Sequence, residues 1–416
     1  MGSRIRWSGI EKKAGYNHEE VTRKMDLFDK FYRGLSSSDL KNMELYPFFR
    51  SIHSAQNPEV MVNGRRMVMT GSNNYLGLNN HPQVKKAAMN AIKKFGTGCA
   101  GSRFLNGNLT LHEELERKLA KFFHREGALV FSTGFQTNLG CISSLVGRED
   151  VVIIDRWDHA SILDGCRMSF GDVKKFRHNN MEDLERILIQ ENDRGKLIII
   201  DGVFSMEGDI AKLPEISRLA KEYSARVMVD DAHGIGVMGE SGRGTLEYFG
   251  LNREIDILMG TFSKSLASIG GFIAGDMDII DYVKHHARSL IFSASIPPPS
   301  AAAVSKALDI IEQEPKRREL LWKNAHKMLE GFKSLRFDTG FSETPIIPII
   351  IGDDMKVLQF WKILHEQGVF ANPVINPGVP KGRSLIRTSF MATHTDKQLD
   401  KVLNAFEKAG KKLKII

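Results

Sequence analysis

Short apolar runs alternate with amphipathic segments through the middle of the chain. The runs are apolar at consecutive positions, as in strands buried on both faces, and they are Gly127–Phe131, Val151–Ile154, Leu197–Ile200, Arg226–Val229, Ile255–Met259 and Phe272–Ala274. Segments between them, such as Met181–Gln190 and Leu213–Tyr223, place apolar residues at helical spacing. Strands buried on both faces and separated by helices predict an α/β domain around a mostly parallel sheet.

The pattern changes on either side of this region. From Asp26 to Ile52, apolar residues recur at helical spacing and predict a helical lead-in. Pro297–Pro299 interrupt the chain before a helical pattern from Ser300 to about Leu335. Further on, Pro345–Ile351 and Arg383–Phe390 resemble strands, and Val357–Gln367 resembles a helix. We therefore expect an N-terminal helical lead-in over residues 1–70, a large α/β domain over 71–305 and a smaller C-terminal α+β domain over 306–416.

Composition and charge are those of a globular protein. Of the 416 residues, 42% are hydrophobic and 26% charged, and the net charge is +8. Several basic residues lie near the two ends: Arg4, Arg6, Lys12, Lys13, Lys408, Lys411, Lys412 and Lys414. A solvated basic surface is the simplest interpretation, with attraction to an anionic substrate or anionic lipid as the alternative. No basic stripe with interleaved aromatic residues is present, so we expect no nucleic-acid partner.

Cysteine usage and the N-terminus suggest a cytoplasmic location. Cys99, Cys141 and Cys166 are widely spaced and form no C-x-x-C pair, so neither a disulfide framework nor a metal site is expected. The polar N-terminus lacks the apolar core of a signal peptide, and no run approaches the ~18 apolar residues of a membrane span. Peripheral contact with the inner face of the membrane stays open.

Three motifs resemble known binding signatures but lack the flanking elements or residues that those signatures require. Gly96–Gly101 matches G-x-G-x-x-G but follows a helical segment, and Gly234–Gly239 follows a strand but continues as a loop. Neither offers the strand and helix that a dinucleotide site needs, which argues against a Rossmann dehydrogenase. His112-Glu113-Glu114 lacks the second histidine of a zinc motif, and we interpret it as a solvated helix face.

Polar and reactive residues follow five of the predicted strands. They are Ser132-Thr133-Gly134-Phe135, Asp158-His159-Ala160-Ser161, the segment Asp201–Asp209 with Ser205, Asp230-Asp231-Ala232-His233, and Thr261-Phe262-Ser263-Lys264-Ser265. Ligands of parallel α/β sheets bind beyond the carboxyl ends of the strands. Turn formation explains one or two such ends, but not a lysine flanked by hydroxyls and an Asp-x-x-His in the same layer.

This set of side chains suits pyridoxal 5'-phosphate. The aldehyde of this cofactor needs a lysine amine for a Schiff base, its ring nitrogen needs a carboxylate, and its phosphate needs amides and hydroxyls. Lys264 stands between Ser263 and Ser265, and Gly134-Phe135 lie at a strand-to-helix turn that offers backbone N–H groups. We therefore expect a site for this cofactor around Lys264.

From Asn73-Asn74-Tyr75-Leu76-Gly77 to Arg387-Thr388-Ser389-Phe390, the chain resembles the α-oxoamine synthase family of fold-type-I pyridoxal phosphate enzymes. The resemblance implies an aspartate aminotransferase-like fold, with a mostly parallel seven-stranded sheet in the large domain. It also implies a homodimer with shared active sites.

The resemblance assigns roles to individual residues. Lys264, His159, Asp230 and His233 would be catalytic: Lys264 as the Schiff-base lysine, Asp230 at the ring nitrogen, His233 at the ring oxygen and His159 stacked on the ring. Ser205 would lie beside the ring, and Gly134, Phe135, Thr261 and Ser263 would hold the phosphate. Arg387 would bind the substrate carboxylate with Asn74 nearby, and Ser295 of Ser293-Ala294-Ser295 would reach the phosphate of the neighbouring subunit.

The family condenses an amino acid with an acyl-CoA. Gly101–Gly107, Phe176–Met181, Gly202–Asp209 and Gly260–Ser265 resemble the bacterial members that use L-serine and a long-chain acyl-CoA. The implied products are 3-ketodihydrosphingosine, CoA and CO2, in the first step of sphingolipid synthesis. Glycine C-acetyltransferase, 8-amino-7-oxononanoate synthase and cysteate acyltransferase are the alternatives. Ile375 stands where some bacterial relatives carry a second arginine.

One further alternative is a non-catalytic partner subunit. Some heterodimeric relatives pair an active chain with one that lacks the lysine, and the presence of Lys264 argues against that interpretation.

Overall fold

The computed structural model describes residues 27–28 and 37–416. Residues 1–26 and 29–36 of the expected helical lead-in, including the basic residues Arg4, Arg6, Lys12 and Lys13, therefore lie outside the described residues.

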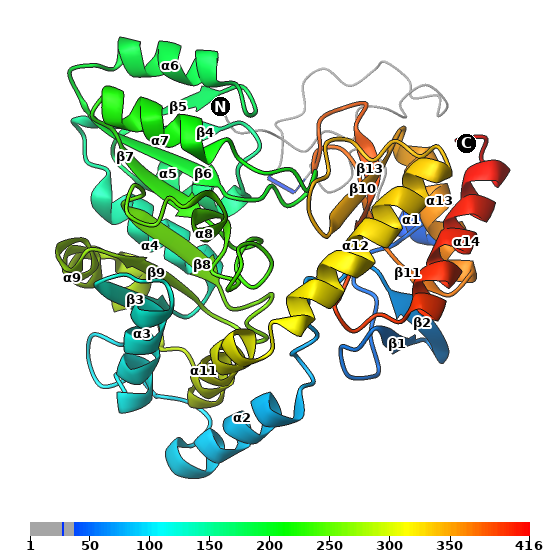
Figure 1. The fold of residues 1–416 in the computed structure, drawn as a ribbon, viewed down its shortest axis with the longest axis horizontal. Helices are drawn as coiled ribbons and strands as arrows, with labels where there is room; N and C mark the ends of the chain where they lie inside the picture. The colour runs from blue at the N-terminus through cyan, green and yellow to red at the C-terminus, as the bar shows by residue number, and fades with distance from the viewer. Residues whose placement is uncertain (1–26, 29–36) are drawn as a thin grey trace.

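A seven-stranded sheet forms the centre of the large domain (Figure 1). Its order is β3-β9-β8-β7-β6-β4-β5, and β9 alone of these strands runs antiparallel to its neighbours. The strands are β3 (Gly127–Phe131), β4 (Asp150–Asp155), β5 (Asp172–Phe176), β6 (Gly195–Asp201), β7 (Arg226–Asp230), β8 (Ile257–Thr261) and β9 (Gly271–Gly275). The predicted fold is confirmed, and only β5, an edge strand with two lysines, was not predicted.

Helices cover both faces of this sheet. One face packs on α4 (Gly134–Leu145), α5 (Ala160–Met168), α9 (Met277–His286) and α10 (Arg288–Ile291). The other packs on α3 (Thr110–Phe122), α6 (Met181–Gln190), α7 (Leu213–Glu222), α8 (Thr245–Phe249) and α11 (Pro298–Gln313), and α2 (Pro82–Phe95) packs against α11. Within β4, Val152 and Ile154 belong to the first core and Val151 and Ile153 to the second. This two-sided burial explains why the strands read as continuous apolar runs.

The helical pattern from Ser300 to Leu335 is two helices, not one. α11 ends at Gln313, and α12 (Lys316–Ser334) begins after Pro315, which has no N–H to continue the first helix. Figure 1 shows α12 running from the large domain to the small one.

The small domain is α+β. Its antiparallel sheet has the order β10-β13-β12, made of β10 (Ile346–Gly352), β12 (Asn372–Val374) and β13 (Ser384–Ser389). Helices α13 (Asp354–Glu366) and α14 (Asp396–Lys412) share its apolar core.

The N-terminal segment differs from the expected helical lead-in. Its described part holds one short helix, α1 (Ser37–Asn42), followed by a hairpin of β1 (Glu59–Val62) and β2 (Arg65–Met69). Asn63 and Gly64 connect these strands with φ angles of 47° and 75°, as a type I′ turn requires. Because β2 also pairs with β11 (Val369–Phe370), the hairpin packs with the C-terminal part of the chain. The expectation of a helical segment up to residue 70 is therefore wrong over 59–69.

Two further observations concern the part of the chain that the structure describes. No helix there has both the length and the apolar character needed to cross a bilayer. Its three cysteines are unpaired.

Candidate active site

A cavity of about 360 Å³ opens at the carboxyl ends of the central strands. Nine of the predicted site residues line it: Gly134, Phe135, His159, Ser205, Asp230, His233, Thr261, Ser263 and Lys264. Five strand ends thus meet in one site, because parallel strands present their carboxyl ends at the same edge.

Lys264 follows β8 and lies in this cavity. Loss of hydration lowers the pKa of its amine to about 8, although the carboxylates of Asp230 and Asp201 act in the opposite direction. An amine with this pKa is partly unprotonated near neutral pH. It can therefore attack an aldehyde or accept a proton.

Asp230 ends β7 and is 5% exposed. Its Oδ2 accepts a hydrogen bond of 2.8 Å from Asn138 Nδ2, and its Oδ1 accepts one of 3.1 Å from the backbone N–H of Ala232. Asn138 lies one turn after Gly134 in α4, and its amide also contacts Ser161 Oγ at 2.8 Å. The carboxylate is fixed in place and can pair with a protonated ring nitrogen.

His159 is the N-cap of α5. Its Nδ1 accepts from the backbone N–H of Ser161 at 3.2 Å and lies 2.7 Å from Ser161 Oγ. Its own backbone N–H donates to Asp201 Oδ2 at 3.1 Å. Burial lowers the pKa of the imidazole, so the ring is neutral and can lie against a flat cofactor.

The N-terminus of α4 and two hydroxyls form a cradle for an anion. The Thr133 side chain caps the helix by accepting from the backbone N–H of Gln136 at 3.1 Å. Thr261 Oγ1 lies 2.9 Å from Ser263 Oγ, and a Cβ on Gly134 would lie 2.7 Å from Thr261 Oγ1. Only glycine leaves this space open, and helix N–H groups with hydroxyls bind phosphate.

His233 and Arg387 complete the side of the site that faces the small domain. His233 is buried, and its Nδ1 lies 2.7 Å from the hydroxyl of Tyr75. Arg387, on β13, donates from Nε to the carbonyl of Ser205 at 2.6 Å and from Nη2 to Asn73 Oδ1 at 3.0 Å. These contacts place a guanidinium from the small domain beside a loop that lines the cavity.

The hydrogen bonds of the Asn74 side chain go to backbone groups and not to Arg387. Its amide donates to the carbonyl of Gln56 at 3.2 Å and accepts from the backbone N–H of Asn79 at 3.3 Å. The side chain therefore holds the local turn, and Asn73 is the residue that touches the guanidinium.

Ser295 and Ile375 also lie away from the cavity. The Ser295 hydroxyl and backbone N–H both donate to the carbonyl of Gly101, at 3.1 and 3.0 Å. Its expected contact with a neighbouring subunit stays a prediction. Ile375 is 7% exposed and packs in the small-domain core.

His112 does not lie on a solvated helix face, so that interpretation of its motif is wrong. The ring is fully buried, its Nδ1 accepts from the backbone N–H of Leu109 at 3.1 Å, and its Nε2 contacts the carbonyl of Ile296 at 2.9 Å. It caps α3 and joins that helix to a distant loop. The described residues contain no cluster of His, Cys, Asp or Glu that could hold a metal ion.

Asn73, Tyr75, Asn138, Ser161 and Asp201 are site residues that the sequence analysis missed as such. Asn138 had a recognisable signal, because it lies four residues after Gly134 on the same helix face. Ser161 and Asp201 lie in strand-end segments that the sequence had already singled out, whereas Asn73 and Tyr75 depend on contacts between segments that are distant in the chain.

These residues fit pyridoxal 5'-phosphate. A lysine of lowered pKa, a hydrogen-bonded carboxylate, a neutral histidine and a phosphate cradle surround one cavity at the strand ends of an α/β sheet. This fold and this site define a pyridoxal-phosphate-dependent enzyme of fold type I.

The chain belongs to the aminotransferase class I and II family, whose sequence model matches residues 65–406. It is 52% identical over 378 residues to the serine palmitoyltransferase of Sphingobacterium spiritivorum, covering 91% of this chain and 95% of that one. It is 48% identical over 380 residues to the 8-amino-7-oxononanoate synthase of Thermoanaerobacter pseudethanolicus, covering 91% and 96%. Among solved structures, it matches the serine palmitoyltransferase of S. paucimobilis with bound PLP–myriocin aldimine. That match has a TM-score of 0.91 and 36% identity, and covers 94% of this chain and 100% of that one. The predicted family, fold and cofactor are confirmed.

Proposed function

We propose that this chain is a serine C-palmitoyltransferase, which condenses L-serine with a long-chain acyl-CoA and releases CoA and CO2. The 52% identity to a serine palmitoyltransferase over most of both chains carries the proposal. The site supports it, because Lys264 and Asp230 supply an amine and a carboxylate to the cavity, and the Arg387 guanidinium, which suits a carboxylate, contacts the Ser205 loop that lines it.

Each of these residues has a separate role in the proposed reaction. Pyridoxal phosphate, when bound, supplies an aldehyde that links to the amino group of serine and a ring that accepts the electron pair of the broken Cα–H bond. Arg387 holds the serine carboxylate, and the amine of Lys264 takes the Cα proton. Asp230 would hold a proton on the ring nitrogen of the bound cofactor, and His159 would lie against the ring face.

The Cα atom of serine then forms a bond to the thioester carbonyl carbon of the acyl-CoA. The C–S bond of the thioester breaks, and the CoA thiolate leaves. Loss of the carboxyl group as CO2 leaves an electron pair on Cα, and the protonated Lys264 returns its proton there. The product is 3-ketodihydrosphingosine. Burial of the lysine suits it to both proton transfers, because an amine with a pKa of about 8 exchanges protons readily near neutral pH.

A homodimer with shared sites is part of the proposal. Phe104 and Leu105 are 54% and 77% exposed, in the same loop as Gly101, which Ser295 contacts. Phe292, 76% exposed, precedes Ser295 by three residues. An apolar surface of this kind around Ser295 suits burial against a second copy. The proposed location is the cytoplasm, with Lys408, Lys412 and Lys414 available to contact an anionic membrane.

An 8-amino-7-oxononanoate synthase is the second candidate, because the chain is 48% identical to one over 380 residues. Titrating the PLP-loaded protein with L-serine, glycine, L-alanine and L-cysteate separates the two by absorbance. We expect the visible band to respond to L-serine at the lowest concentration, and palmitoyl-CoA then to release free CoA thiol. A response to L-alanine alone would transfer the proposal to the second candidate.

Lys264→Ala should abolish CoA release, whereas Lys284→Ala, at an exposed position of α9, should not change it. Full turnover by Lys264→Ala would overturn the catalytic assignment.

A further inference from the structure

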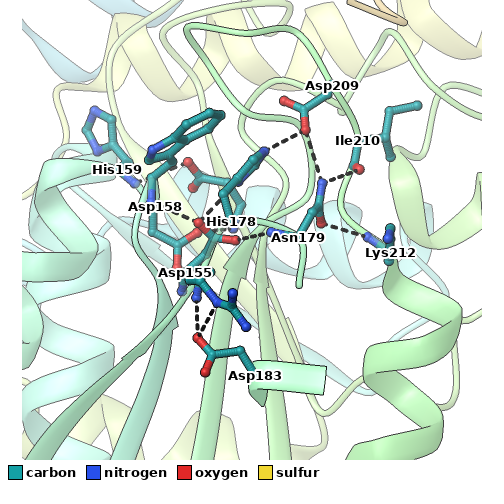
Figure 2. Close-up of polar contacts among 12 residues, drawn as sticks. Asp155, Asp158, His159, His178, Asn179, Asp183, Asp209, Ile210 and Lys212 are labelled. Carbon is teal, nitrogen blue, oxygen red and sulfur yellow. Dashed lines mark hydrogen bonds and ion pairs between the residues drawn. The ribbon is translucent and has the colours of Figure 1, made fainter. Parts of the chain in front are cut away.

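The imidazole of His178 lies between two buried carboxylates outside the cavity (Figure 2). Its Nδ1 is 3.2 Å from Asp155 Oδ1, at the end of β4, and its Nε2 is 2.8 Å from Asp209 Oδ2, in the loop after β6. The side chains of Asp155 and Asp209 are 0% and 7% exposed, and that of His178 is 14% exposed.

Both ring nitrogens of His178 face acceptors, so both must carry hydrogen. Only the imidazolium satisfies this requirement, since a neutral imidazole has one donor and one acceptor nitrogen. Burial by itself lowers the pKa of His178, but the hydrogen bonds to Asp155 and Asp209 outweigh it and raise the pKa to about 9. His178 is therefore a largely buried cation that joins two strand-end loops.

The first of these loops leads to His159. Asp155 Oδ1 also accepts from the backbone N–H of Trp157 at 2.8 Å, and the Trp157 ring stacks on His178 with centroids 3.9 Å apart. Asp158 ties this turn to β6, because its carboxylate accepts from the backbone N–H groups of Asp155 and Asp201 at 2.8 and 2.9 Å. The two residues before His159 are thus held on one side by His178 and on the other by β6.

The second loop contains Ser205. The Phe204 ring meets the His178 ring edge-on at 4.4 Å, and the backbone N–H of Phe204 donates to the carbonyl of Asp209 at 3.0 Å. Asn179 reinforces the arrangement, since its side-chain amide donates to Asp209 Oδ2 at 3.0 Å and to the carbonyl of Ile210 at 3.1 Å. Figure 2 shows His178 and Asn179 reaching Asp209 from the same side.

The loop after β6 also contacts the small domain. Glu207 pairs with Arg383 at 2.8 Å, and the carbonyl of Ser205 accepts from Arg387 Nε at 2.6 Å. Arg383 also lies 5.6 Å from the centre of the Trp157 ring. A shift of this loop would therefore move the Ser205 carbonyl that holds the Arg387 guanidinium. We assign this guanidinium to binding of the substrate carboxylate.

We propose that His178, paired with Asp155 and Asp209, is a positioning residue that sets the amino-acid affinity of the site by fixing the His159 and Ser205 loops relative to each other. This proposal rests on the proposed function in assigning an amino-acid substrate to the cavity. His178 does not line the cavity itself, so it acts through Ser205 and Arg387.

The test compares His178→Gln with His285→Gln, an exposed histidine of α9. Glutamine retains a donor but loses the charge and the second hydrogen bond to a carboxylate. For His178→Gln we expect the half-saturating L-serine concentration of the absorbance change, and the KM for L-serine, to rise about tenfold. The KM for palmitoyl-CoA and the bound PLP per chain should stay within about twofold of wild type, and His285→Gln should match wild type throughout.

Asp209→Asn and the double variant His178→Gln/Asp209→Asn complete a cycle. If the two residues act as one unit, the double variant should raise the KM for L-serine no more than the larger single effect. Asp209→Asn also serves as the second variant if His178→Gln does not fold. An unchanged KM for L-serine in both single variants, with or without a lower melting temperature, would overturn the proposal. If the wild-type band responds to another amino acid, the same comparison is made with that amino acid, so failure of the proposed substrate is distinguished from failure of the positioning role.

Discussion

The hydroxyl of Tyr75 lies 2.7 Å from Nδ1 of His233 and joins the segment before α2 to the loop after β7. Burial raises the pKa of Tyr75 to about 12 against the opposing effect of Arg387, so the hydroxyl keeps its proton. Burial, aided by the charges of Lys264 and Arg387, holds the pKa of His233 well below its usual range. A neutral ring that accepts from Tyr75 at Nδ1 carries its proton on Nε2, ready to donate into the cavity.

Tyr75→Phe removes the group that selects this tautomer. We expect kcat to fall about tenfold, which corresponds to the ~1.4 kcal/mol of one oriented hydrogen bond. The visible band of bound cofactor should shift without loss of bound PLP, as measured by absorbance and by released PLP. Tyr248→Phe, at a residue 55% exposed, should behave as wild type. Equal effects of the two substitutions would contradict the tautomer argument.

We expect substitutions at three positions to differ in how much they raise the KM for L-serine: Arg387, Asn73 and Asn74. Arg387→Lys keeps the charge but loses the planar fork, and we expect the KM for L-serine to rise roughly 30–100-fold. Asn73→Ala removes the 3.0 Å contact to the guanidinium and should raise that KM several-fold, by ~1 kcal/mol. Steady-state kinetics at saturating palmitoyl-CoA measures both.

Asn74→Ala is the matched comparison, because it removes the same side chain one position along. It should lower thermal stability through loss of the bonds to Gln56 and Asn79, and leave the KM for L-serine nearly unchanged. A larger KM effect at Asn74 than at Asn73 would restore the sequence-based assignment.

This pair also shows what the sequence could predict and what it could not. Asp230 ends a buried strand, and Lys264 and His159 lie within four residues of the ends of two others. Because both the strand pattern and the residue type are local, these residues could be placed at one edge of the sheet. Asn73 and Asn74 are adjacent and identical, and which amide faces Arg387 depends on the turn before α2 and on a strand more than 300 residues away. No local sequence pattern indicates which of the two asparagines contacts Arg387.

The errors at the N-terminus and at His112 have different origins. The hairpin β1-β2 had a local signal in Asn63-Gly64, but helical spacing before Ile52 favoured a helix throughout. The burial of His112 comes from its contact with Ile296, 184 residues further along the chain. Long-range packing therefore overrides the polar character of the surrounding helix.

Gly208→Ala should disturb the joint between the two domains. Gly208 has φ +74°, and a Cβ there would lie 2.1 Å from the carbonyl oxygen of Ile346. Its own carbonyl accepts from the Thr344 hydroxyl at 2.9 Å and from the backbone N–H of Glu343 at 3.0 Å. Because a backbone atom blocks the new methyl, we expect a loss of roughly 2–4 kcal/mol in stability and a higher KM for L-serine.

Gly250→Ala provides the control for this substitution. Gly250 has a similar φ of +70°, and nothing lies within 4 Å of the position that the new methyl group would take. Only the cost of the backbone conformation, ~1 kcal/mol, should therefore appear. Differential scanning calorimetry of the PLP-loaded proteins measures both. Equal losses at the two glycines would show that the contact with Ile346 does not matter.

The raised pKa of His178 predicts how its contribution to stability depends on pH. Folded His178 has a pKa of about 9, against ~6.5 for an unfolded histidine, so the folded protein binds the proton more tightly. The charged groups around the ring are Asp155 from β4, Asp209 from the loop after β6, and Arg383 near Trp157. The resulting stabilisation is fully present below about pH 6.5 and is lost as the pH rises through about 9.

The free amine of Lys264, in any protein that has lost the cofactor, titrates in the same region with the opposite sign, because burial lowers its pKa to about 8. The contribution of Lys264 cancels when the free energy of unfolding of His178→Gln is subtracted from that of wild type, since both proteins contain the lysine. Urea unfolding of the PLP-loaded proteins should give a gap of up to ~3 kcal/mol in favour of wild type at pH 6.5, narrowing by pH 9.5. His285→Gln should match wild type at both pH values, because the residue is exposed. A gap of the same size at pH 6.5 and 9.5 would mean that His178 stabilises the protein by packing on Trp157 and Phe204 and not by its charge.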